Sequence, residues 1–155
     1  MQPRRYKIPR FLDGIVTQEA YARWLYRKGM AHVRRDRKRG NKNAVGEAYR
    51  SAIHLAVQKC EGKDVYTGEP LDWTLLGKYD NEDSKAGRSK YKARFALLPT
   101  VDHVDDGMGA ANFLICSWRV NDAKNDLSRE EFVQLCHRVV DFHRIQSKEV
   151  QVKRA

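Results

Sequence analysis

The sequence lacks several features that mark well-known classes of protein. No apolar run approaches the ~20 residues of a membrane-spanning helix, and the basic N-terminus lacks the apolar stretch of a secretory signal. No internal repeat, Walker-type glycine-rich loop or G-x-S-x-G serine motif occurs. These absences argue against P-loop and serine-hydrolase chemistry and predict a soluble, cytoplasmic protein that makes no membrane contact.

Cysteine is scarce and follows no metal-binding spacing. Cys60, Cys116 and Cys136 form no C-x-x-C pair, and each stands beside apolar residues. This pattern indicates a reducing compartment and reduced thiols in the core.

Acidic residues are almost missing from residues 1–42, which hold thirteen Lys or Arg and only three Asp or Glu. This excess equals the net charge of the whole chain, +10, and favours a polyanionic partner. Cations at a helix end also suit the helix dipole, so a merely solvated end is the alternative. We expect phosphate contacts from Arg4, Arg5, Arg34, Arg35, Arg37, Lys38 and Arg39.

Length and hydrophobic pattern predict a single α+β domain over residues 1–155. Its first part, residues 1–42, is a basic arm and a helix that Thr17 caps and Gly40 ends. The remaining expected segments are a helix over 44–59, a hairpin or knuckle over 64–73 that turns at Thr67-Gly68, and a mobile loop over 78–92. A capping box, Ser128 with Glu131, starts a C-terminal helix over 128–145 whose apolar side is buried, followed by a frayed tail from Ser147.

Residues 95–126 are the most informative stretch. The apolar run 95–98 predicts a buried strand that leads to Asp102 and His103. After a glycine-containing loop, Asn112 opens a second apolar strand, and Asn121 and Asn125 follow at helical i, i+4 spacing. A unit of strand, loop, strand and short helix would bring the Asp, the His and the first two Asn together around one metal ion and one water.

Those residue types suit phosphodiester hydrolysis. A neutral histidine, with its ordinary pKa of ~6.5, can take a proton from water at neutral pH. A divalent cation polarises the phosphate and offsets charge on the leaving oxygen. Mg²⁺ prefers oxygen ligands and keeps several waters, so the Asp102 carboxylate and the Asn121 amide would suffice. Asn112 could hold the backbone at His103 across the loop.

Asp102-His103, Asn112 and Asn121-Asp-Ala-Lys124 resemble the ββα-metal motif of HNH nucleases, in the subtype with Asp-His, Asn and Asn. The resemblance covers residues 95–126 and implies a ββα-metal core flanked by the N-terminal helices and the C-terminal helix. It also implies the following roles: Asp102 and Asn121 as metal ligands, His103 as general base, Asn112 as loop-positioning residue and Lys124 as a substrate contact. Asn125 matches a position where some members have a further ligand, so either Asn121 alone or Asn121 with Asn125 completes the metal shell.

Two departures from the family affect the expected metals. The C-x-x-C pairs of many relatives are missing, so no structural zinc is expected. The last ligand is Asn rather than His, which favours Mg²⁺ or Mn²⁺ over softer metals. We therefore predict a metal-dependent endonuclease that hydrolyses phosphodiester bonds of double-stranded DNA. The alternatives are a non-catalytic nucleic-acid-binding protein with a degenerate HNH fold, and a basic helical protein whose Asp, His and Asn residues serve turns and caps.

Overall fold

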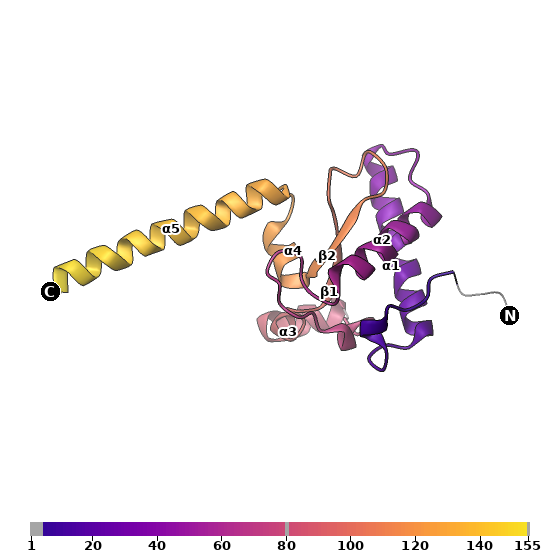
Figure 1. The fold of residues 1–155 in the computed structure, drawn as a ribbon, viewed down its shortest axis with the longest axis horizontal. Coiled ribbons are helices and arrows are strands. Elements are labelled where there is room, and N and C mark those ends of the chain that lie inside the picture. Colours follow the sequence, from indigo (N-terminus) through magenta and orange to yellow (C-terminus); the bar gives the residue numbers. More distant parts are fainter. Residues whose placement is uncertain (1–4, 80, 155) are drawn as a thin grey trace. The chain divides into compact units, whose positions relative to one another are not determined.

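A computed structural model describes residues 5–79 and 81–154 and divides the chain into two compact units, Met1–Ala123 and Lys124–Ala155 (Figure 1). The described residues combine helices with one small antiparallel sheet, which agrees with the predicted α+β class. The elements of the first unit are η1 (Arg10–Leu12), α1 (Gln18–Arg39), α2 (Gly46–Cys60), η2 (Trp73–Leu75), α3 (Asn81–Arg94), β1 (Pro99–His103), β2 (Phe113–Ser117) and all but the last residue of α4 (Trp118–Lys124).

Helix α1 is bounded as its sequence predicts. Thr17 Oγ1 accepts a hydrogen bond from Ala20 N at 3.1 Å, and Gly40, with φ of 114°, ends the helix in the left-handed conformation. Helix α1 packs on α2, and α2 packs on β2. A Cβ at Gly29 would lie 2.8 Å from Arg50 Cγ, so the glycine permits the close approach of α1 to α2. The buried face of α1 consists of Tyr21, Trp24, Leu25, Gly29, His32, Val33 and Asp36.

Strands β1 and β2 form an antiparallel hairpin in which His103 is paired with Phe113. The second strand lies where the sequence predicts it, but the prediction of a strand at 95–98 is wrong. Residues 95–97 form a turn that continues the end of α3, with Leu98 N bonded to Phe95 O at 3.0 Å. Phe95 and Leu98 are therefore buried as a helix-ending turn, and the strand starts at Pro99.

The segment after α2 is the predicted knuckle. Lys63 pairs with Pro70 in an isolated antiparallel bridge, and Gly68 turns the chain with φ of 73°. The buried Asp64 carboxylate accepts hydrogen bonds from Tyr66 N at 2.7 Å and Ser117 N at 2.7 Å, and a longer one from Thr67 N at 3.3 Å. One carboxylate therefore closes the knuckle and joins it to the end of β2.

The prediction of a loop at 78–92 is wrong, because most of this segment lies in helix α3. Glu82 and Asp83 stand in its first turn and Lys92 and Arg94 in its last, an order that favours a helix through its dipole. Lys85 Nζ also lies 2.7 Å from Glu82 Oε1, one helical turn apart. Gly87 and the high charge hid this helix from the sequence pattern.

The second unit contains helix α5 (Arg129–Arg154). Its capping box is confirmed, with Ser128 N bonded to Glu131 Oε2 at 2.8 Å and Glu131 N to Ser128 Oγ at 3.2 Å. The predicted frayed tail is wrong, because the helix continues to Arg154. The predicted buried side is also wrong: Leu135, Cys136, Val139 and Val140 are exposed, since a single helix has no second element in its unit to cover that side.

Among the described residues, no helix is both long and apolar enough to cross a membrane.

Candidate active site

His103 ends β1, and its ring lies among aromatic neighbours. The ring centroids of His32 and Phe113 are each 4.9 Å from that of His103. Its Nε2 is hydrogen-bonded to Asp36 Oδ2 at 2.8 Å, across 67 positions of sequence. Only 11% of the His103 side chain and 1% of the Asp36 side chain are exposed. The hairpin thus delivers the predicted histidine to a buried carboxylate from α1.

Tyr49 of α2 completes this arrangement. Its hydroxyl donates to the same Asp36 oxygen, Oδ2, at 2.5 Å. Burial and the nearby carboxylate raise the pKa of Tyr49, so the phenol keeps the proton that it donates. The three side chains come from α1, α2 and β1, and none of these elements could hold His103 in this way alone. We call Asp36, Tyr49 and His103 the Asp–Tyr–His cluster.

His32 stands one helical turn before Asp36 and packs against the His103 ring. Burial lowers the pKa of His32 to about 3, and the positive charges of the nearby Arg35 and Lys28 act in the same direction. His32 is therefore neutral at physiological pH. Its Nδ1 is buried and makes no hydrogen bond within the described chain. This imidazole is a packed neighbour of the cluster.

The loop between β1 and β2 covers the Asp–Tyr–His cluster. In Figure 1 this loop extends to the C-terminal end of α1, and a hydrogen bond joins the two. Asn41 Nδ2 donates to Gly107 O at 2.8 Å and, at 3.3 Å, to Gly109 O. Gly107 has a φ of 74°, and a Cβ at this position would lie 3.1 Å from the Asp36 carboxylate. The loop backbone therefore rests directly on the buried charge.

Asn112 makes the bond across the loop through its backbone. Its carbonyl accepts a hydrogen bond from Val104 N at 3.2 Å, next to His103, while its side chain is exposed. The hairpin is thereby closed immediately beyond the His103–Phe113 pair. The role implied for the Asn112 side chain stays a prediction.

Asp102 and Asn121 are both half-buried. Side chains alternate between the faces of a strand, and the contacts of His103 with α1 place Asp102 on the opposite face of the hairpin. Asn121 lies on α4, whose first residue is tied to the approach to β1 by the bond from Trp118 N to Leu98 O at 2.8 Å. Asp102 is therefore not part of the Asp–Tyr–His cluster, and its partnership with Asn121 stays a prediction.

Lys124 and Asn125 belong to the second unit. Lys124 is buried, and Asn125 follows the end of α4 with φ of 52°, so the expected helical spacing does not reach it. Their roles as substrate contact and metal ligand stay predictions. Within the described part of the chain, no group of three or more His, Cys, Asp or Glu side chains is arranged to hold a metal ion.

The predicted phosphate-contacting cations flank the buried Asp36 in the last two turns of α1. This basic helix end consists of Arg34, Arg35, Arg37, Lys38 and Arg39, all exposed. Arg37 Nε donates to Ala44 O at 2.9 Å, and Arg5, on the N-terminal arm, pairs with Glu47. Arg4 lies outside the described residues. The helix end thus offers positive charge to solvent beside the Asp–Tyr–His cluster.

Asp36 was not among the predicted site residues, because it is hidden in the run Arg34-Arg-Asp-Arg-Lys-Arg39. A signal was available: Asp36 follows His32 by one turn and extends the buried face of α1. A carboxylate at an apolar helix position needs a buried partner. Neither Tyr49 nor Asn41 was part of the predicted site.

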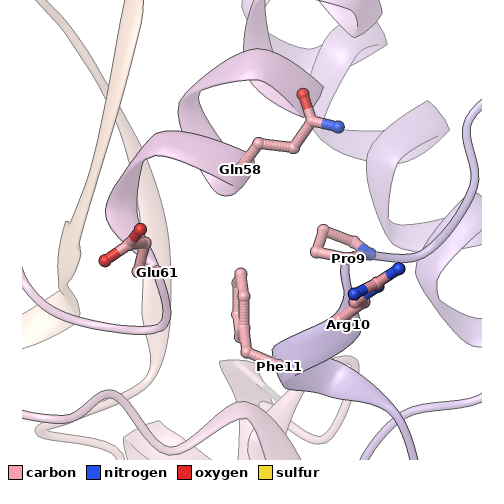
Figure 2. A pocket seen from close by; sticks show the side chains of 5 residues that line it. All are labelled: Pro9, Arg10, Phe11, Gln58 and Glu61. Carbon is pink, nitrogen blue, oxygen red and sulfur yellow. The ribbon is translucent and has the colours of Figure 1, made fainter.

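An open pocket lies away from these residues, between the N-terminal segment and the end of α2 (Figure 2). Its lining consists of Pro9, Arg10, Phe11, Gln58 and Glu61. No residue of the Asp–Tyr–His cluster and no predicted metal ligand contributes to it, so it plays no part in the candidate site.

Comparisons with protein-family models, with curated proteins and with solved structures gave no significant match.

Proposed function

We propose that the protein is a metal-dependent endonuclease of the HNH type that hydrolyses DNA phosphodiester bonds. The observation that carries the proposal is the position of His103: it ends the first strand of a strand–loop–strand–helix unit, and a buried carboxylate holds its ring. The basic helix end beside it supplies the positive charge that a DNA backbone requires. Double-stranded DNA is the proposed substrate.

In the proposed reaction, His103 takes a proton from a water molecule. The water oxygen forms a bond to phosphorus, the bond from phosphorus to the 3′ oxygen breaks, and solvent protonates the leaving oxygen. A divalent cation, Mg²⁺ or Mn²⁺, would polarise the phosphate and offset the charge on the leaving oxygen. The Asp102 carboxylate and the Asn121 amide are the proposed ligands, and these oxygen donors fit the preference of such ions.

The test is nicking of supercoiled plasmid with Mg²⁺, with and without a chelator. We expect wild-type protein to nick only with metal, and His103→Ala to be ~10²–10⁴-fold slower, as for loss of a general base. His137→Ala is the matched control, because His137 is an exposed histidine of α5. Absence of metal-dependent nicking by wild type, or equal nicking by His103→Ala, would reject the proposal.

A non-catalytic nucleic-acid-binding protein is the second candidate, and the exposed basic helix end favours it as strongly as it favours the nuclease. Both candidates predict binding that weakens with salt, with a log–log slope of about −4.5 for ~5 phosphate contacts. The binding protein would show this slope without nicking. The nuclease would show it and would keep it in His103→Ala, because that change removes no cation.

A further inference from the structure

The His103 ring is held from outside the hairpin that carries it. Asp36 Oδ2 is bonded to Nε2, and the same oxygen accepts the Tyr49 hydroxyl. Within the described residues, the bond at Nε2 is the only hydrogen bond of the ring. The other ring nitrogen, Nδ1, has no hydrogen bond there and is not fully buried. The two ring nitrogens are therefore in different environments.

We infer that Asp36 is the positioning residue of the proposed general base: it fixes the orientation and tautomer of His103 so that Nδ1 takes the proton from water. The inference rests on the proposed nuclease function. A carboxylate accepts and does not donate, so Nε2 carries the hydrogen of the shared bond and the Nδ1 lone pair is left available.

Burying the Asp36 carboxylate costs folding free energy that a residue serving packing alone would not need to cost. Its side chain is 1% exposed, and its second oxygen, Oδ1, has no hydrogen-bond partner in the described part of the chain. A buried carboxylate with an unsatisfied oxygen destabilises the fold relative to an apolar residue. Val33, one turn earlier on the same helix face, is apolar. The carboxylate is therefore explained by the partner it holds.

The surroundings keep the Asp36–His103 bond dry and fixed. Tyr49 approaches it from α2, Gly107 covers the carboxylate, and Asn41 fastens the covering loop. Low local dielectric strengthens a bond of this kind, and the closely packed backbone leaves the carboxylate little room to turn. The proposed base is thus oriented before substrate arrives.

Asp36→Asn is the decisive variant, because it keeps the shape of the side chain and presents an amide to Nε2. We expect kcat for plasmid nicking to fall ~10²–10⁴-fold with little change in KM, as for a general base held incorrectly. DNA binding and Mg²⁺ binding should be unchanged. Asp141→Asn, the same change at an exposed position of α5, should behave like wild type.

A second readout does not depend on cleavage. In protein labelled with ¹⁵N-histidine and assigned with His103→Ala, NMR at about pH 8, above the ordinary histidine pKa of ~6.5, reports which ring nitrogen carries hydrogen. We expect hydrogen on Nε2 in wild type and a shift toward Nδ1 in Asp36→Asn. Hydrogen on Nδ1 in wild type would overturn the inference even if the variant failed to fold.

The outcomes separate this inference from the proposed function. If wild type nicks and Asp36→Asn nicks equally well, Asp36 does not position the base and the nuclease proposal stands. If wild type does not nick, the nuclease proposal fails, and the NMR result alone decides whether Asp36 sets the tautomer. Tyr49→Phe keeps the carboxylate and should slow nicking by no more than ~10-fold, the equivalent of one hydrogen bond of ~1.4 kcal/mol.

Discussion

Two aspartates of the first unit are almost completely buried, and they are satisfied in different ways. Asp64, 2% exposed, accepts hydrogen bonds from three backbone N–H groups through both of its oxygens. Asp36, 1% exposed, is bonded through one oxygen to two side chains, His103 and Tyr49. Its other oxygen has no partner in the described residues.

The difference lies in what each carboxylate holds. Backbone donors are fixed by the fold, so Asp64 joins the knuckle to the end of β2 and stabilises both. The partners of Asp36 carry transferable protons, and bonds to them set the state of a histidine. Burial alone does not distinguish a structural carboxylate from a functional one, whereas the chemical type of the partners does.

Replacing Asp64 should have the largest effect on stability. Asp64→Ala leaves the buried N–H of Ser117 and two knuckle N–H groups without an acceptor. At ~1–3 kcal/mol for the buried Ser117 N–H and about 1 kcal/mol for each of the two partly exposed knuckle bonds, we expect the free energy of unfolding to fall by about 3–5 kcal/mol. Urea denaturation measures this loss.

Asp36→Asn is the matched change at the other carboxylate. It should cost only about 1–2 kcal/mol, because the amide nitrogen that replaces Oδ2 can donate to His103 Nε2 and to the Tyr49 hydroxyl, which can each accept a hydrogen bond. The two variants would then differ in what they lose: Asp64→Ala loses mainly stability, and Asp36→Asn loses mainly nicking activity. A larger stability loss in Asp36→Asn than in Asp64→Ala would contradict this assignment.

The features that were predictable from the sequence depend on local chemistry. The Thr17 cap, the Gly40 stop and the Ser128 capping box each involve residues a few positions apart, and all are present. The second strand was predictable from its apolar run, which ends where Ser117 caps α4 by accepting from Val120 N at 3.2 Å.

The features that were missed depend on distant residues. Asp36 and His103 are 67 positions apart, and no local pattern joins a helix residue to the end of a later strand. The run 95–98 was taken for a strand because its apolar residues are buried, but a turn after α3 buries them equally well. The exposed side of α5 follows from its lone position in its unit, which hydrophobic spacing does not report.

Gly107 and Gly68 have nearly the same φ, and each lies near a different one of the two aspartates. Gly107 has φ of 74° and rests on Asp36, whereas Gly68 has φ of 73° in the Asp64 knuckle with nothing within 4 Å of its missing Cβ. Gly68→Ala should cost ~1–2 kcal/mol, the left-handed penalty alone. Gly107→Ala adds contact with the Asp36 carboxylate, so we expect a further ~1 kcal/mol and slower nicking.

Gly109→Ala is the control within the covering loop. Gly109 has no atom within 4 Å of its missing Cβ and no positive φ, so the change should alter stability by less than ~0.5 kcal/mol. Equal stability losses in Gly107→Ala and Gly68→Ala would show that the loop does not press on the carboxylate.

His32, which lies beside Asp36, predicts that the free energy of unfolding depends on pH. Within the described residues, Asp64 has no such histidine among its hydrogen-bond partners. Unfolded His32 binds a proton below its ordinary pKa of ~6.5, while the folded protein holds the pKa of His32 at about 3. Between these values the unfolded state binds more protons, so stability falls as pH falls from ~6.5 toward 3, by up to ~1.4 kcal/mol per unit.

His32→Leu should remove this contribution, because leucine fills the buried position without titrating. Urea denaturation at several pH values below ~6.5 would then show a shallower loss of stability in His32→Leu than in wild type. His143→Leu, at an exposed position of α5, should keep the wild-type slope. Equal slopes in wild type and His32→Leu would mean that His32 accepts a proton in the folded state. Water would then reach the Asp–Tyr–His cluster more easily than its burial indicates. The Asp36–His103 bond would not be strengthened by a low local dielectric.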